Sequence, residues 1–253
     1  MYAEQRQQRV VERARSDGRV DVAALAAEFG VTTETVRRDL TALERHGLLR
    51  RVHGGAIPVE RLGFEPSIGA RDAVMTEEKQ RIAKAALAEL PAGGSVLVDA
   101  GTTTARLAEL LPGDRDLTVV TNALPIALTL SVRPGLTLLL VGGRVRGRTL
   151  AAVDDWALRI LRDLYVDVAF IGTNGISVER GLTTPDPAEA AVKRTMLESA
   201  RRVVVLADHT KVDTDHFASF GRIQDVHVLV TDSGLDEAAA RRLEAAGPRV
   251  VRA

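Results

Sequence analysis

Glycine and hydroxyl residues follow a short apolar segment near the middle of the chain. Residues 95–100 read SVLVDA, and Gly101, Thr102, Thr103 and Thr104 come next, at the start of a segment with helical periodicity. Free backbone N–H groups and the helix dipole favour an anion at such a position, so this stretch could hold a phosphate group. It is neither a P-loop nor a dinucleotide fingerprint, because the further glycines are absent. The alternative is an ordinary strand-to-helix turn with threonine caps.

Polar residues or glycines also follow four other apolar segments. They are Thr121-Asn122, Gly142-Gly143, Gly172-Thr173-Asn174-Gly175 and Asp208. Each is individually no more than a turn signal. If the apolar segments are parallel strands of one sheet, however, these residues meet at the carboxyl edge, where such sheets bind ligands. Together they predict a ligand site there.

Lysine is scarce, and two of the four lysines fall near the same predicted edge. The four are Lys79, Lys84, Lys193 and Lys211, whereas arginine is abundant. An ammonium group is a compact point charge that suits a phosphate, so Lys193 and Lys211 could balance a dianion. The alternative for Lys193 is a surface pair with Glu189, four residues earlier on the same predicted helix, which would contribute only a little stability.

The N-terminal part carries two adjacent arginines in a second informative pattern. Val36, Leu40 and Leu43 have the spacing of a buried helix face, which leaves Arg37 and Arg38 on the opposite face. Basic and hydroxyl groups in the first turns of a helix suit base edges and phosphates in the DNA major groove. We predict the following DNA-contacting residues on this helix and in the hairpin after it: Thr33, Thr35, Arg37, Arg38, Thr41, Arg51 and His53. For His53 a role in stabilising the turn is equally compatible with the sequence.

The surrounding elements predict a winged helix-turn-helix over residues 1–58. A first amphipathic helix spans 4–16, a second, VAALAAEF, follows Asp21 as N-cap, and a third is capped by Thr32 or Thr33. Residues 48–59, LLRRVHGGAIPV, favour a β-hairpin around Gly54-Gly55. Residues 1–59 hold ten arginines against eight acids, so the basic signal lies in the positions of the arginines and not in net charge.

The rest of the chain alternates apolar strands with amphipathic helices. Residues 59–75 predict a linker, with two prolines and two glycines between 58 and 69, and a helix begins at Thr76. In the predicted sensor domain, 76–253, strands are expected at 95–100, 117–122, 136–143, 166–172, 202–208 and 227–232. Strands that are apolar throughout and separated by helices predict an α/β fold with a largely parallel sheet covered on both faces.

Composition excludes several classes of protein. The 253 residues include no cysteine, which removes disulfides and thiol chemistry, and the formal net charge is zero. No apolar run approaches the length of a membrane span, and the polar N-terminus is unlike a signal peptide. We expect a cytoplasmic protein that does not bind membranes.

These motifs resemble those of DeoR-family bacterial transcriptional regulators along nearly the whole chain. VDVAALAAEFGVTTETVRRDLTALERHGLLRRVHGGA resembles the DNA-binding domain, and DAGTTT, DVAFIGTNG, GLTTPD, EAAVK and VVVLADHTK resemble the sensor domain. The resemblance implies a fold similar to ribose-5-phosphate isomerase and coenzyme A transferases. It also implies a repressor of carbohydrate genes that binds an operator in double-stranded DNA as a homo-oligomer, dimer or tetramer, and responds to a phosphorylated sugar.

The same resemblance implies an effector site and the residues that form it. Gly101 to Thr104 would hold the phosphate, and the implied effector residues are Asp99, Gly101, Thr102, Thr103, Thr104, Asn122, Gly143, Lys193, Asp208 and Lys211. Asp39 would be a structural partner and not a DNA contact. No metal, other cofactor or catalytic residue is expected.

Two points stay open at the level of sequence. Where the family usually has a glycine a few residues after Thr149, this chain reads LAAVDDWAL, and Asp154 and Asp155 either cap the next helix or face the pocket. The alternative function is a sugar-phosphate isomerase with a DNA-binding appendage. Its carboxylate base would come from Asp99, Asp186, Glu189 or Asp208.

Overall fold

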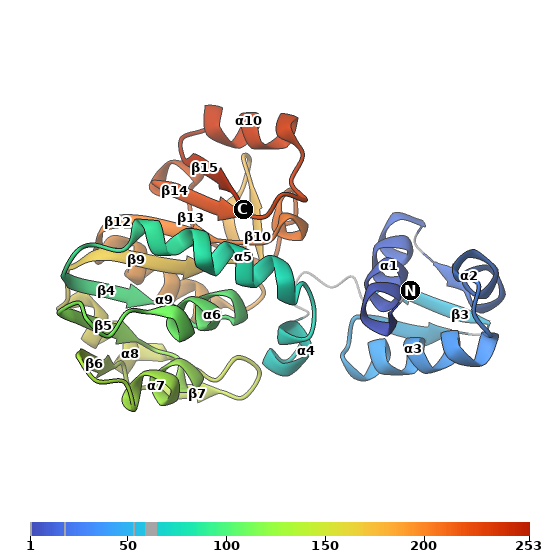
Figure 1. Cartoon of the computed structure of the whole chain (residues 1–253), viewed down its shortest axis with the longest axis horizontal. Helices are drawn as coiled ribbons and strands as arrows, with labels where there is room; N and C mark the ends of the chain where they lie inside the picture. Colours follow the sequence, from blue (N-terminus) through green and yellow to red (C-terminus); the bar gives the residue numbers. More distant parts are fainter. Residues whose placement is uncertain (1, 18, 53, 59–64) are drawn as a thin grey trace. The chain divides into compact units, whose positions relative to one another are not determined.

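A computed structural model describes residues 2–17, 19–52, 54–58 and 65–253 and separates the chain into two units, Met1–Val74 and Met75–Ala253 (Figure 1). Each unit has its own buried apolar side chains and is described by itself. The segment expected as a linker, 59–75, includes a short helix, α4 (Ile68–Asp72), N-capped by Ser67. The predicted domain boundaries remain predictions.

The first unit holds α4 and, before it in the chain, a three-helix winged fold. Its helices are α1 (Ala3–Asp17), α2 (Val22–Phe29) and α3 (Thr33–Arg45), and its strands are β1 (Val20–Asp21), β2 (Leu49–Val52) and β3 (Gly55–Pro58). The three strands form an antiparallel sheet in the order β1-β3-β2. This confirms the predicted winged helix-turn-helix.

Helix caps fix the turn between α2 and α3. Asp21 accepts hydrogen bonds from the backbone N–H groups of Ala23 and Ala24, as predicted, and Gly30 ends α2 with a left-handed φ of 64°. Of the two candidate caps for α3 the structure uses Thr32, whose hydroxyl accepts from the N–H of Thr35 at 3.1 Å.

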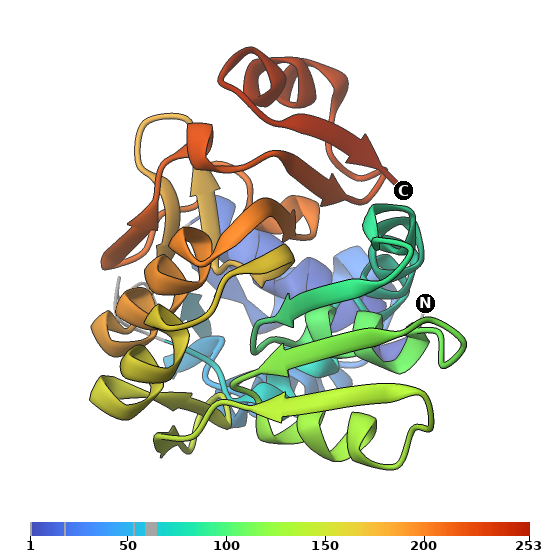
Figure 2. The ribbon, with the colours of Figure 1, turned by 90° about the vertical axis from the view of Figure 1, so that its left-hand side faces the viewer.

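The second unit is built on a seven-stranded parallel sheet in the order β15-β14-β12-β9-β4-β5-β6 (Figure 2). The strands are β4 (Gly94–Val98), β5 (Leu117–Thr121), β6 (Leu136–Leu140), β9 (Val166–Gly172), β12 (Ala200–Leu206), β14 (Val228–Thr231) and β15 (Arg249–Arg252). This confirms the predicted α/β fold. The strand β15 was not predicted from the sequence, because its four residues, RVVR, are few and half of them are charged.

Helices cover both faces of this sheet. Side chains from α5 (Thr76–Ala86), α6 (Thr102–Leu110) and α7 (Leu124–Ser131) join one buried cluster, and those from α8 (Asp154–Arg162), α9 (Pro187–Glu198) and α10 (Glu237–Ala245) join the other. Adjacent strand residues enter opposite clusters, for example Leu97 and Val98, because side chains alternate across a strand. Two buried faces explain why these strands are apolar throughout.

Smaller elements extend the carboxyl edge of the sheet. β7 (Arg144–Arg146) and β8 (Ala151–Val153) form a hairpin, and β10 (Gly175–Ser177), β11 (Gly181–Thr184) and β13 (Ala218–Gly221) form a second antiparallel sheet. Short 3-10 helices lie at Leu87–Glu89, His209–Lys211 and Ile223–Asp225. Within the described residues, no helix is long and apolar enough to span a membrane.

Candidate functional site

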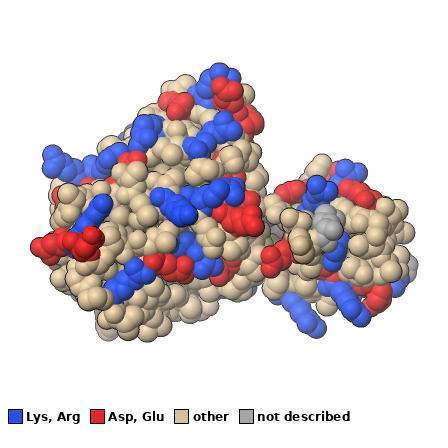
Figure 3. Space-filling view, viewed as in Figure 1, with Lys and Arg blue, Asp and Glu red and all other residues tan. Residues whose placement is uncertain are grey.

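The outward face of α3 carries the predicted arginines. Val36, Leu40 and Leu43 are buried in the core of the first unit, whereas Arg37 and Arg38 are exposed. Basic side chains project from the outer side of α3 in the space-filling view (Figure 3). Arg37 Nη1 lies 3.6 Å from the exposed carboxylate of Glu34, and both guanidinium groups remain accessible to an external anion.

The hairpin formed by β2 and β3, which we call the wing, places a third arginine beside the same face. Glu44 of α3 accepts a hydrogen bond from the backbone N–H of Arg51 at 2.9 Å, and an Arg51 guanidinium N–H donates to the Thr41 hydroxyl at 3.3 Å. Thr41 also donates to the carbonyl of Arg37. Thr33 is exposed and Thr35 is half-buried, while His53 lies outside the described residues. Apart from His53, the predicted residues thus lie on α3 and the adjoining strand β2.

Asp39 has a structural position within α3. Its carboxylate accepts from Arg6 Nε at 2.5 Å, from Arg6 Nη2 at 3.2 Å and from Gln7 Nε2 at 3.0 Å. Both Arg6 and Asp39 are buried. The prediction that Asp39 is a structural partner is confirmed, because this contact joins α1 to α3.

At the carboxyl edge of the sheet, the centre of the second unit's candidate site is a buried ion pair between Asp99 and Lys193. Asp99 follows β4, and Lys193 reaches it from α9; they are 1% and 4% exposed. Lys193 Nζ also donates to the carbonyl of Gly172 at 2.9 Å, and the N–H of Gly172 donates to Asp99 Oδ2 at 3.0 Å. Burial raises the pKa of Asp99 above its ordinary value, and the Lys193 ammonium offsets this only in part.

The start of α6 lies against this pair. A methyl group added at Gly172 would lie 3.6 Å from Asp99 Oδ2 and 4.0 Å from the Thr104 side chain, so these groups share one small space. Gly101 is the N-cap of α6 and offers no side chain to its N–H groups, and the first turn holds no acid. Within the described residues, the hydroxyls of Thr102 and Thr103 have no hydrogen-bond partner. The open helix start favours an anion, and the Lys193 ammonium, which is paired with Asp99, lies nearby.

Glu189 does not form the surface pair with Lys193 that the sequence allowed. It is 5% exposed and accepts hydrogen bonds from the Thr149 hydroxyl and from Arg146 at 2.5 Å. Arg146 also pairs with Asp186 at 3.3 Å. Burial acts to raise the pKa of Glu189, but the charge of Lys193, the Thr149 hydrogen bond and Arg146 outweigh it, so the pKa lies below its ordinary value. That surface-pair interpretation is wrong.

Asn122 and Gly143 meet the strand β8 at the same edge. Asn122 is 2% exposed; its amide donates to the carbonyl of Ala152 at 3.0 Å, but within the described residues its Oδ1 has no partner. Gly143 has φ of 154°, and a Cβ there would lie 2.6 Å from the Val153 carbonyl oxygen. The buried Asn122 Oδ1 is suited to accept a hydrogen bond from a ligand hydroxyl, because a buried acceptor without a partner costs free energy.

Asp208 and Lys211 form a separate group after β12. Asp208 accepts from the backbone N–H of Thr210 at 3.1 Å and from its hydroxyl, and Lys211 Nζ lies 3.6 Å from Asp208 Oδ2. Burial acts to raise the pKa of Asp208, but Lys211, Thr210, Lys79 and His209 outweigh it and lower the pKa. Among the described residues, no hydrogen bond or ion pair joins Asp208 or Lys211 to the Asp99–Lys193 pair.

The capping role considered for Asp154 and Asp155 is wrong. Val153 is the N-cap of α8 and neither carboxylate accepts a cap hydrogen bond; both lie in the first turn. Asp154 has a left-handed φ of 72° and pairs with Arg144 Nε at 2.5 Å, while Asp155 is exposed. A left-handed backbone at Asp154 suits the glycine that the resemblance leads one to expect near this position.

Two family models match the chain. One, described as the DeoR C terminal sensor domain, matches residues 74–233, and the other, the DeoR-like helix-turn-helix domain, matches residues 6–61. The chain belongs to the DeoR family. It is a transcriptional regulator with an N-terminal DNA-binding domain and a C-terminal sensor domain.

Relatives of this DeoR-family chain align along almost all of it. It is 38% identical to the HTH-type transcriptional regulator GlpR of Haloferax volcanii, over 99% of this chain and 98% of that protein. It is 36% identical to the transcriptional repressor AccR of Agrobacterium fabrum, over 90% and 89%. The identity to the glycerol-3-phosphate regulon repressor of Escherichia coli K12 is 31%, over 92% of both chains.

Solved structures resemble part of this DeoR-family chain. Ribose 5-phosphate isomerase A from Methanocaldococcus jannaschii superposes with a TM-score of 0.40 and 17% identity, over 55% of both chains. The eIF2B beta protein from Chaetomium thermophilum superposes with a TM-score of 0.44 and 14% identity, over 63% of this chain and 49% of that one. The chain thus spans about half the length of these solved proteins.

Lys79 is a charged residue of the sensor domain that our predicted site omitted. It lies in the first turn of α5, is 5% exposed, and its charge lowers the pKa of Asp208. A buried cation near a helix N-terminus is unfavourable for the helix dipole, so nearby anionic groups must offset it. The scarcity of lysine in the sequence was the signal from which Lys79 could have been predicted as a site residue.

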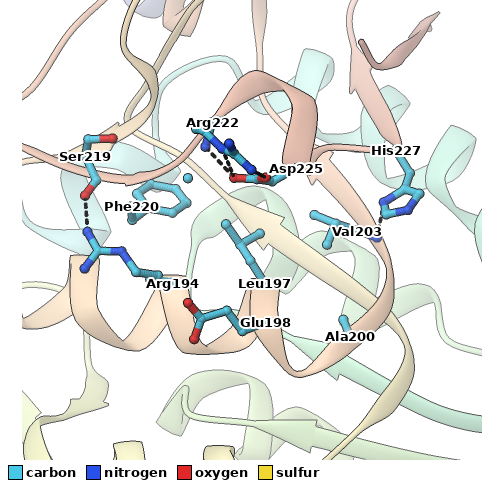
Figure 4. Close-up of a pocket in the computed structure, with 11 residues that line it drawn as sticks. Arg194, Leu197, Glu198, Ala200, Val203, Ser219, Phe220, Arg222, Asp225 and His227 are labelled. Carbon is cyan, nitrogen blue, oxygen red and sulfur yellow. Dashed lines mark hydrogen bonds and ion pairs between the residues drawn. The ribbon is translucent and has the colours of Figure 1, made fainter.

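A shallow groove of about 580 Å³ lies at the opposite edge of the sheet of this DeoR-family chain, near the amino ends of β12 and β14 (Figure 4). Apart from that of Glu198, the polar side chains that line it are already engaged. Arg222 pairs with Asp225 at 2.9 Å, Arg194 donates to the Ser219 carbonyl at 2.7 Å, and His227 accepts from the N–H of Val203 at 3.1 Å. The groove therefore presents fewer unmet polar groups than the carboxyl edge does.

Proposed function

We propose that this regulator binds an operator in double-stranded DNA through α3 and the wing and that a phosphorylated sugar controls this binding. The observation that carries the effector class is the open N-terminus of α6 beside the buried Lys193. A phosphate would accept hydrogen bonds from the N–H groups of Thr102 to Thr104 and lie close to a fixed positive charge.

The remaining polar groups suit the sugar part of such a ligand. Asn122 Oδ1 can accept a hydroxyl hydrogen, and the missing side chain of Gly143 lets the backbone of β8 pack closely beside it. Asp208, Lys211 and Lys79 form a second charged group at the same carboxyl edge, which could contact the far end of a longer ligand. The glycerol-3-phosphate regulon repressor among the relatives, by its name, supports a small phosphorylated effector.

We propose a repressor that acts by ligand-controlled release, in the cytoplasm and as a homo-oligomer. An effector changes operator affinity only to the extent that it binds the DNA-competent and incompetent states unequally. Two helix-turn-helix modules bind two operator half-sites more tightly than one does, which favours a dimer or a tetramer.

We also propose that the protein is not an isomerase. A general base must reach the carbon acid with its carboxylate free. Here Asp99 is tied to Lys193 and Gly172, Glu189 to Arg146 and Thr149, Asp186 to the N–H of Glu189, and Asp208 to Thr210. Turnover of ribose 5-phosphate by the purified protein would overturn this part of the proposal.

The test combines DNA binding with a ligand screen. A thermal-shift screen of sugar phosphates should find one that raises the melting temperature, and that compound should change the affinity for an operator fragment in fluorescence anisotropy. Lys193→Met should abolish both effects of the ligand. Lys84→Met, on the exposed side of α5, is the matched lysine control and should retain them. Retained ligand response in Lys193→Met would reject the proposed site.

Arg37→Ala and Arg38→Ala test the DNA-binding face. Each should abolish or severely weaken operator binding, since a guanidinium in bidentate contact with a guanine provides roughly 1–3 kcal/mol of base discrimination. The far-UV circular dichroism should not change because both side chains are exposed. Unchanged affinity of either variant would exclude that residue from the interface.

A further inference from the structure

The helix α7 carries large apolar side chains on its exposed face as well as on its buried face. Its sequence, LPIALTLS, has no charged residue. Ile126, Ala127 and Leu130 are buried in the core, while Leu124 and Leu128 are exposed, the latter to 73%. Val132, which follows at the C-cap, is 83% exposed. Although Thr129 and Ser131 are polar, exposed apolar residues spaced four apart along one face form a patch of the kind that marks an interaction site.

The neighbouring strand β6 extends this apolar surface. β6 is an edge strand of the sheet, contacts α7 and has the uncharged sequence LTLLL. Leu140 is 48% exposed and lies on the same side of the strand as Leu136 and Leu138, which pack with the α7 cluster. We call Leu124, Leu128, Val132 and Leu140 the α7–β6 face. The lower left margin of the larger unit, where Figure 1 places α7, is mostly uncharged in Figure 3.

The two outermost strands of the sheet, β6 and β15, differ in how their unpaired sides are protected. At the other edge, β15 has the sequence RVVR; Arg249 pairs with Glu89, and Arg252 donates to the Ser233 carbonyl. Charged side chains of this kind keep an exposed strand from pairing with other chains. β6 has no such residue, so its edge is suited to being covered.

We infer that the α7–β6 face is where two copies of this chain associate, about a two-fold axis. The absence of charge argues against DNA or an anionic ligand as the occupant, because both require basic groups. Two identical neutral faces can approach without repulsion, and apolar centres depleted in charge are typical of homodimer interfaces. This inference rests on the proposed function in one respect: operator recognition needs a second DNA-binding module.

The test measures oligomeric mass in the absence of DNA and effector, by sedimentation and light scattering of the full chain. The wild-type protein should be a dimer or larger at micromolar concentration. Leu128→Glu should weaken association roughly 30-fold or more, since it places two carboxylates near the two-fold axis. Tyr165→Glu, which changes a residue of similar exposure (71%) just after α8, is the matched control and should keep the wild-type mass.

A charge-swap experiment separates loss of the interface from loss of the fold. Leu128→Glu and Leu128→Lys should each keep the wild-type circular dichroism spectrum and associate poorly alone, whereas their mixture should recover the dimer. A monomeric wild type, or an unaltered mass of Leu128→Glu, would overturn the inference. A monomeric wild type would also contradict the proposed homo-oligomer, whereas an unaltered mass of Leu128→Glu would reject only this interface. Arg37→Ala tests DNA contact by α3 independently of mass.

Discussion

Asp99 accepts hydrogen bonds from both Lys193 and the N–H of Gly172, so one buried carboxylate joins β4, β9 and α9. Removal of one partner leaves the other charge buried and unpaired, which typically costs about 3–5 kcal/mol. We therefore expect Lys193→Met and Asp99→Asn each to lower the free energy of unfolding substantially.

The double variant Asp99→Asn/Lys193→Met should be less destabilised than the sum of the two single variants. The difference is a coupling energy of about 1–3 kcal/mol, to be measured by urea unfolding. Lys84→Met, an exposed lysine substitution, should stay within about 0.5 kcal/mol of the wild type. Strictly additive effects would mean that the buried pair does not act as a unit.

The contact between Arg6 and Asp39 predicts that two kinds of substitution in α3 abolish DNA binding for different reasons. Asp39→Ala leaves the Arg6 guanidinium buried and unpaired, so it should destabilise the DNA-binding unit by about 3 kcal/mol. Arg37→Ala removes an exposed side chain and should change stability by less than about 0.5 kcal/mol. Denaturant unfolding followed by circular dichroism distinguishes them, and equal stability of the two variants would contradict the prediction.

The lowered pKa of Glu189 predicts a pH dependence of stability. Its carboxylate is more stable in the folded than in the unfolded chain, so its contribution is present above its ordinary pKa of 4.5 and is lost as the pH falls through the lower folded value. Glu189→Gln should therefore be less stable than the wild type at pH 7, by about 1–3 kcal/mol, and the difference should narrow in acid.

Urea unfolding at pH 7, 5, 4 and 3 measures this difference. Glu198→Gln, an exposed change on the same helix, is the control and should show no such trend. The pKa of Asp208 is also lowered from its ordinary value of 3.8, so its contribution to stability is likewise lost in acid. The raised pKa of Asp99 changes stability with pH in the opposite direction. The comparison of variants with the wild type at each pH isolates Glu189 from both.

The left-handed backbone at Asp154 predicts an unusual order of stability. A non-glycine residue with positive φ is strained by roughly 1–2 kcal/mol, while the ion pair of Asp154 with Arg144 is largely exposed and contributes at most about 1 kcal/mol. Asp154→Gly should therefore be at least as stable as the wild type, and about 1 kcal/mol more stable than Asp154→Ala. Thermal melts measure this order, with Asp155→Ala as the neighbouring control; equal melting of the glycine and alanine variants would refute it.

Some of the fold could be read from local sequence signals. Residues close together in the sequence predict the caps Asp21 and Thr32, the helix α2 over VAALAAEF and the start of α5 at Thr76. The apolar sequences of the strands predict that both faces of the sheet are buried. The surface-pair interpretation of Lys193 could not be decided in that way. Its partner Asp99 is 94 residues away in sequence, so only the assembled sheet brings the two together.

The carboxyl edge also contains features with no local signal. The positive φ of Asp154 depends on how β8 meets α8, and the unpaired oxygen of Asn122 depends on the position of Ala152. Lys79 had a weak signal in its rarity, but its proximity to Asp208 depends on how α5 packs against β12 and β14. Long-range packing therefore decides those parts of the candidate site that the sequence left open.

The burial of the lysines has a practical consequence for chemical labelling. Lys79 and Lys193 are buried and Lys211 is partly covered, so Lys84 is the one exposed lysine side chain. An amine-reactive dye at moderate pH would attach mainly to Lys84 and the α-amino group, on a chain that has no cysteine to compete. A single engineered cysteine could carry a second dye, so the protein is well suited to two-colour fluorescence measurements of its response to ligands.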